Sequence, residues 1–331
     1  MSKGQKNRHQ LKDRARKPGS VMARFTALCC LMLFVTPIFA DDGTAPHGGQ
    51  SLAVLFSDQT PPYEQFRQGF EEEMNESRPF SLYQTRELDR SAADTLRDEP
   101  LIIAVGASAT RWALENSTAD VFATMVPADS IEQLGKRFPE RKLHALYIDQ
   151  APYRHMALMR SSLPDAERIT LLCRDPQPAR LEALMAAADR LDLKLEFRQV
   201  RNRSEIIRAV QAVHRETDAF IVLPASEAMG PADLRALLLH SFRTGVPVFG
   251  YSPGLVSAGT IAAIHSNPQS LGRETARKFK GLQNSQAPRW ASSTFPVHYD
   301  LTINREVARS LGIPLPSESA LRQAIDSMET R

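Results

Sequence analysis

The first residues whose chemistry could serve a ligand are Ser57 and Asp58, which directly follow the apolar run Leu52–Phe56. Asp58 could bind the ammonium group of a ligand, or it could cap the helix that Pro61 begins. Tyr63 could offer its ring or hydroxyl to the same ligand, or it could belong to the apolar face of that helix. We expect ligand contacts where this run ends.

A turn at Gly106 has the composition of an anion site. Gly106 follows the apolar run Leu101–Val105, and Ser108 lies where a helix should begin. The backbone amides of Ala107 and Ala109 flank Ser108, and free amides at the start of a helix attract a carboxylate. The alternative is that Ser108 only caps the helix.

Later turns carry further candidates. Asp149, Gln150 and Tyr153 lie before the apolar run that ends at Cys173, and Tyr251 and Ser252 directly follow the run that ends at Gly250. Ser226 and Glu227 follow another apolar run, and Glu227 could bind a cationic group. Each of these residues is predicted to contact a ligand, whereas Asp129 is expected to cap a short helix.

Catalytic and metal-binding patterns are missing from the sequence. It contains no GxSxG, HExxH or P-loop pattern, and its eight histidines are scattered. Of three cysteines, two lie in the first 40 residues, so Cys173 is expected to be a small buried apolar residue. We therefore predict no enzyme activity, no cofactor and no metal. A secreted α/β hydrolase is the remote alternative.

The N-terminal segment is typical of a secretory signal peptide. Residues 1–40 contain eight Lys or Arg and one Asp, followed by an apolar stretch that ends at Ala40. The apolar stretch is short for a membrane-spanning helix, although an uncleaved signal anchor is the alternative, and translation could start at Met22. The remaining residues carry 33 basic and 37 acidic groups, which gives no basic field for nucleic acid or acidic lipid. We predict a signal peptide over 1–40, a flexible linker over 41–50 and a periplasmic protein.

The rest of the chain alternates strand-like and helix-like segments. Short apolar runs predict buried parallel strands, and each is followed by apolar residues at helical spacing. The clearest runs end at Phe56, Val105, Cys173, Leu223 and Gly250. Repeated βα units predict an α/β protein with two doubly wound parallel-sheet lobes.

Four segments carry a resemblance to a known family. Residues 246–282 read VPVFGYSPGLVSAGTIAAIHSNPQSLGRETARKFKGL, and residues 303–316 read INREVARSLGIPLP. Together with residues 57–74 and 102–113, they are similar to the ABC-transporter substrate-binding proteins, of the type that binds tryptophan or tyrosine. The resemblance covers about residues 51–316.

The resemblance implies a type I periplasmic binding protein fold, in which three crossovers join two lobes. We expect these crossovers near Asp149, Tyr251 and Ala291. Lobe 1 would then comprise residues 51–148 and 251–290, and lobe 2 residues 149–250 and 291–331. The implied function is capture of a small molecule, an amino acid or related compound, between the lobes. The implied partner is an ABC permease or, alternatively, a membrane sensor kinase, with the protein a monomer that reaches the membrane only through that partner.

Overall fold

The computed structural model describes residues 52–74, 79–174, 177–224, 229–281 and 292–330. The expected signal peptide and linker, together with Ser226, Glu227 and Ala291, lie outside these residues. All of the described residues belong to one compact unit that spans Gly48–Arg331. None of the helices in these ranges has the length and apolar character that a bilayer-spanning helix needs.

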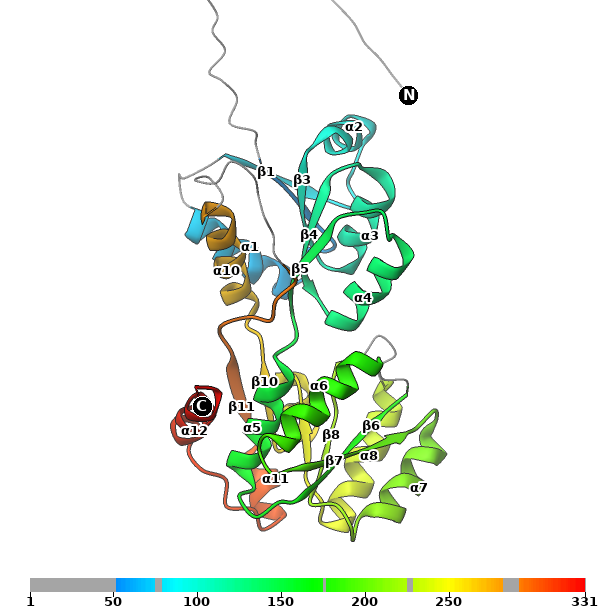
Figure 1. The fold of residues 1–331 in the computed structure, drawn as a ribbon, viewed down its shortest axis with the longest axis vertical. Helices are drawn as coiled ribbons and strands as arrows, with labels where there is room; N and C mark the ends of the chain where they lie inside the picture. The colour runs from blue at the N-terminus through cyan, green and yellow to red at the C-terminus, as the bar shows by residue number, and fades with distance from the viewer. Residues whose placement is uncertain (1–51, 75–78, 175–176, 225–228, 282–291, 331) are drawn as a thin grey trace, which may run out of the picture. The chain divides into compact units, whose positions relative to one another are not determined.

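The first sheet contains five parallel strands in the order β2-β1-β3-β4-β5. Helices α1 and α10 pack together over one face, and α2, α3 and α4 cover the other (Figure 1). Its elements are β1 (Leu52–Phe56), α1 (Pro61–Met74), β2 (Phe80–Gln84), α2 (Arg90–Asp98), β3 (Leu101–Val105), α3 (Ala107–Asn116), β4 (Asp120–Val126), α4 (Ala128–Arg137), β5 (Leu143–Tyr147) and α10 (Pro268–Gly281).

The second sheet contains six strands in the order β11-β10-β9-β8-β6-β7, of which only β11 is antiparallel to its neighbour. Helices α5, α6 and α12 cover one face, and α7 and α8 cover the other. Its elements are α5 (Pro152–Ser162), β6 (Arg168–Cys173), α6 (Pro178–Asp189), β7 (Lys194–Gln199), α7 (Arg203–Val213), β8 (Ala219–Ile221), α8 (Pro231–Thr244), β9 (Val248–Gly250), α9 (Pro253–Ala258), β10 (Ala262–His265), β11 (Asp300–Ile303), α11 (Arg305–Ser310) and α12 (Glu318–Glu329).

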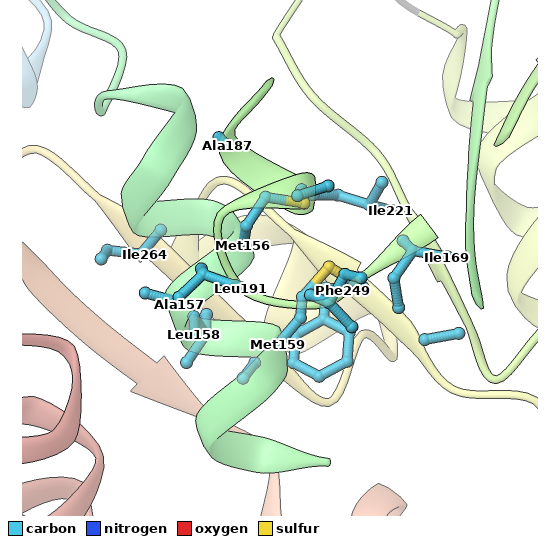
Figure 2. Packing of buried hydrophobic residues seen from close by; sticks show 14 of the residues in the cluster. Met156, Ala157, Leu158, Met159, Ile169, Ala187, Leu191, Ile221, Phe249 and Ile264 are labelled. Carbon is cyan, nitrogen blue, oxygen red and sulfur yellow. The ribbon is translucent and has the colours of Figure 1, made fainter. Parts of the chain in front are cut away.

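The predicted α/β class with two parallel-sheet lobes is confirmed, because each sheet is built from βα units. Buried apolar residues fill the space between each sheet and its helices. In the second lobe, Met156 and Met159 of α5 pack toward Ile221 and Phe249 of the sheet (Figure 2). Such strands, apolar on both faces, are the continuous runs that a sequence displays most clearly.

Two of the expected crossover positions differ from those in the structure. Strand β10 pairs with β9 and β11, so residues 251–265 belong to the second sheet, and the second passage lies at Ser266 and Asn267 rather than near Tyr251. Thr294 still bridges to Leu146 of the first sheet, so the third passage follows Thr294 rather than Ala291. The first passage runs from Ile148 to Ala151, between β5 and α5.

Candidate functional site

A cavity of about 330 Å³ lies at the carboxyl ends of strands from both sheets. Ligands of open α/β sheets bind at this edge, where strand ends and loop amides converge. Its walls come from the ends of β4 and β10, the first two passages, α5, and the turns that follow β8 and β9. They comprise Met125, Pro127, Ile148, Asp149, Gln150, His155, Pro224, Tyr251, Ser252, Pro253, Ile264, His265 and Ser266.

Asp149 connects the first passage to helix α4. Its side chain is 3% exposed, and Oδ2 accepts a 2.6 Å hydrogen bond from the amide of Ala128, the first residue of α4. Among the described residues Oδ1 has no hydrogen-bond partner. Burial raises the pKa of this carboxyl, and the guanidinium of Arg180 and the Ala128 amide oppose that rise. Asp149, which lines the cavity, therefore has one buried carboxylate oxygen that can accept further hydrogen bonds.

Gln150 holds the three passages together. Its Nε2 donates to Ser266 Oγ at 2.7 Å and to the carbonyl of His298 at 3.2 Å. Its Oε1 accepts from Nη1 of Arg154 at 2.7 Å. Arg154 in turn donates to the carbonyls of Pro296 and Val297 and pairs with Glu329 of α12. These bonds fix the hinge side of the cavity.

His155 forms part of the cavity wall from the first turn of α5. Its side chain is 3% exposed, and its Nε2 has no hydrogen-bond partner among the described residues. Burial, together with the positive charges of Arg180 and Arg154, lowers the pKa of His155 from 6.5 to about 3. The imidazole is therefore neutral at physiological pH.

Met125, at the end of β4, forms another part of the cavity wall. It adopts the left-handed conformation, with φ at 57°, where the register between β4 and β5 shifts. This conformation is uncommon for a residue with a side chain, and such strain concentrates at ligand sites. Nothing in the sequence around Met125 signals this conformation.

A second cavity, of about 450 Å³, shares Gln150 and His155 with the first and lies between α4 and α6. In its wall, Asp129 of α4 pairs with Arg180 of α6 at 3.1 Å, with side chains 3% and 15% exposed. Asp129 was expected to cap α4. The structure instead uses Asp149 for that bond, because Asp129 lies inside the helix and points toward the other lobe's arginine.

Tyr251 is a further predicted ligand contact that lines the first cavity, as do Gln150 and Ser252. It is half-buried, and burial and the nearby Asp149 raise its pKa. Tyr251 and Asp149 therefore lie close to one another although they are far apart in the sequence.

The predicted residues at the ends of β1 and β3 form a separate cluster that lines neither cavity. Ser57 Oγ accepts a 2.8 Å hydrogen bond from the amide of Ala109 and so caps α3 from another strand. A Cβ atom on Gly106 would lie 2.5 Å from Tyr63 Oη and 2.6 Å from Ser57 Oγ, so these three residues are in close contact.

This cluster changes the expectation for the anion site. The N-cap of α3 is Gly106, with φ at 93°, and Ser108 is exposed, so Ser108 is not the helix cap. The amide of Ala109 is already bonded to Ser57, which leaves fewer amides to receive a carboxylate. Asp58 bonds to the amide of Gln59 and lies 3.8 Å from Arg86.

Tyr153 lies away from both cavities. Its hydroxyl donates to the carbonyl of Met328 in α12 at 2.8 Å, and Arg190 stacks on its ring. The prediction placed Tyr153 at the first passage, but the helix turns its side chain toward the C-terminal helix.

The described residues contain no cluster of three or more His, Cys, Asp or Glu side chains arranged to hold a metal ion. Cys173, expected to be buried, is partly exposed at the end of β6. Sequence reasoning missed the roles of His155, Arg180 and Met125, since their neighbours come from distant parts of the chain.

Two βα lobes, three passages and a cavity at the strand ends define the type I periplasmic binding protein fold. The chain belongs to the ABC transporter substrate binding protein family, whose model matches residues 148–327. No curated protein sequence matches the chain.

Solved structures share the fold. The chain is similar to the ligand-free, open structure of a substrate binding protein with adhesive properties from Clostridium difficile, with 15% identity, a TM-score of 0.64, and coverage of 82% of this chain and 97% of that one. It is also similar to an ABC domain in complex with L-Trp from Streptococcus pneumonia, with 16% identity, a TM-score of 0.54, and coverage of 82% and 98%. A conserved domain protein from Vibrio cholerae has 19% identity, a TM-score of 0.54, and coverage of 83% and 98%.

Proposed function

We propose that this protein is an extracytoplasmic solute receptor that captures a small molecule, an amino acid or related compound, and delivers it to an ABC permease. The observation that carries the proposal is the cavity at the strand ends, whose wall includes the buried polar groups of Asp149, Gln150 and His155. In such a receptor the two lobes close on the solute about the passages between them.

Family membership supports the permease as partner, because the family is named for substrate binding in ABC transport. The Streptococcus structure was solved with L-Trp, which supports an amino acid or a related compound as ligand. We further propose that the protein acts by binding rather than by catalysis, and as a monomer.

We propose export to the periplasm through cleavage of residues 1–40. The basic start and short apolar stretch of this segment support the proposal. Mass spectrometry of the periplasmic fraction should find a mature N-terminus at Asp41. An intact leader in the membrane fraction would instead indicate a signal anchor.

A thermal-shift screen of the purified protein tests solute binding. The panel should include amino acids, amines, short peptides, sugars and organic acids. A solute at 100 times its dissociation constant should raise the free energy of unfolding by about 2.7 kcal/mol. If no class stabilises the protein, the receptor proposal is wrong.

Uptake of the identified solute by cells with and without the gene then separates transport from sensing. Loss of uptake in the deletion strain supports delivery to a permease. Unchanged uptake with a lost transcriptional response would support the sensor-kinase alternative.

A further inference from the structure

We propose that the captured solute presents a protonated amine to Oδ1 of Asp149. This inference rests on the proposed receptor function and adds the chemical class of the ligand. It requires an ammonium group, but it does not require a carboxylate on the same molecule.

The carboxylate of Asp149 supplies the first argument. Oδ2 accepts a hydrogen bond from the Ala128 amide. Oδ1 has no hydrogen-bond partner among the described residues, and the side chain is only 3% exposed. A buried carboxylate oxygen without a partner is costly, because it has lost its hydration. An ammonium group brings both a positive charge and three hydrogen-bond donors. Both properties match what this oxygen lacks.

The charge balance of the cavity supplies the second argument. The described part of its wall contains one carboxylate and neither lysine nor arginine. Arg180, whose positive charge acts on Asp149, borders the second cavity and is paired with Asp129 at 3.1 Å. An anionic solute would therefore meet a like charge in the described wall of this cavity, whereas a cation would meet a charge of opposite sign.

The remaining wall suits a compact organic cation. Met125, Ile148 and Ile264 supply apolar surface, and the half-buried Tyr251 supplies an aromatic ring beside Asp149. Aromatic faces attract cations. The volume of about 330 Å³ lies near the lower end of the range of ligand cavities, so the solute is small.

Titration calorimetry with matched compounds tests the inference. Each set shares one skeleton: phenethylamine, phenylalanine and 3-phenylpropionate; tryptamine, tryptophan and indole-3-propionate; isopentylamine, leucine and 4-methylpentanoate. In at least one set the amine and the amino acid should bind at least ten times more tightly than the acid that lacks nitrogen. An acid that binds as tightly as its amine would overturn the inference.

Two variants locate the interaction. Asp149→Asn keeps an oxygen that can accept from the Ala128 amide but removes the charge, so it should weaken amine binding by about 10- to 100-fold. Asp120→Asn, at the opposite end of β4, is the matched control and should leave binding unchanged. Equal affinity of Asp149→Asn and the wild type for the amine would overturn the inference.

The outcomes also separate the inference from the function it rests on. If only sugars or nitrogen-free acids bind, the amine inference is wrong and the receptor function stands. If no compound of any class binds, the receptor function itself is contradicted. If Asp149→Asn does not fold, the comparison of amine with acid in the wild-type protein still decides.

Discussion

Replacing His155 by glutamine should reduce the acid sensitivity of the fold. Burial and two nearby guanidinium groups lower the pKa of this imidazole from 6.5 to about 3. Between these values the unfolded chain binds a proton at this position and the folded protein does not. The free energy of unfolding therefore carries no penalty from His155 above pH 6.5, and it decreases as the pH falls from 6.5 toward 3.

The magnitude follows from the interval between pH 6.5 and the assay pH. Each pH unit below the pKa of the unfolded chain costs about 1.4 kcal/mol while the folded imidazole stays neutral. At pH 5, His155 should therefore lower the free energy of unfolding by about 2 kcal/mol relative to its value at pH 7.5. The pKa values of His144 and His265 are also lowered by burial, so they add a loss of the same sign.

Chemical denaturation at pH 7.5 and pH 5 measures this effect. The wild type should lose about 2 kcal/mol more between the two conditions than His155→Gln does. His298→Gln, at an exposed position, serves as the control and should behave as the wild type. The contributions of His144 and His265 cancel in the comparison. An equal loss in the wild type and His155→Gln would refute the reasoning.

Three further pairs of variants test the structure by chemical denaturation. Gly69→Ala should lower the free energy of unfolding by about 1–3 kcal/mol, because its Cβ would lie 2.0 Å from the carbonyl oxygen of Gln269 in α10. Gly135→Ala, with no atom within 4 Å of its Cβ, should instead stabilise α4 by about 0.5–1 kcal/mol, and equal effects would contradict the helix packing. Ser57→Ala should cost about 0.5–2 kcal/mol through the lost cap of α3, and Ser108→Ala should change stability little; the reverse order would restore Ser108 as the cap. Gln150→Leu should lower the free energy of unfolding by about 1–3 kcal/mol, because Ser266, His298 and Arg154 lose a hydrogen-bond partner. Gln68→Leu on the exposed face of α1 is the control, and an unchanged stability of Gln150→Leu would argue against the hinge network.

The strands of both sheets could be predicted from the sequence where they are buried on both faces. β1, β3, β6 and β9 appear as short apolar runs followed by helical spacing, and these local patterns determine the fold class. The lobe assignment of β10 could not be read in this way, because its place depends on pairing with β9 and β11.

Only part of the candidate site was predictable, because the residues expected at the ends of β1 and β3 form a separate cluster that lines neither cavity. Asp149 and Tyr251 follow strands and line the cavity, as strand ends should. The partners of Ser57, Asp149 and Arg180 lie on other elements, so no local pattern reports them. The direction of Tyr153 was missed because helix α12, whose carbonyl it bonds, is distant in the sequence.

Small-angle X-ray scattering with and without the stabilising solute tests the central claim that two lobes capture a small molecule between them. Closure of the lobes about the three passages should reduce the radius of gyration when the solute saturates the protein. The Asp149→Asn variant should need about 10- to 100-fold more solute than the wild type to reach the smaller radius. An unchanged radius for the wild type at saturation would contradict capture by closure.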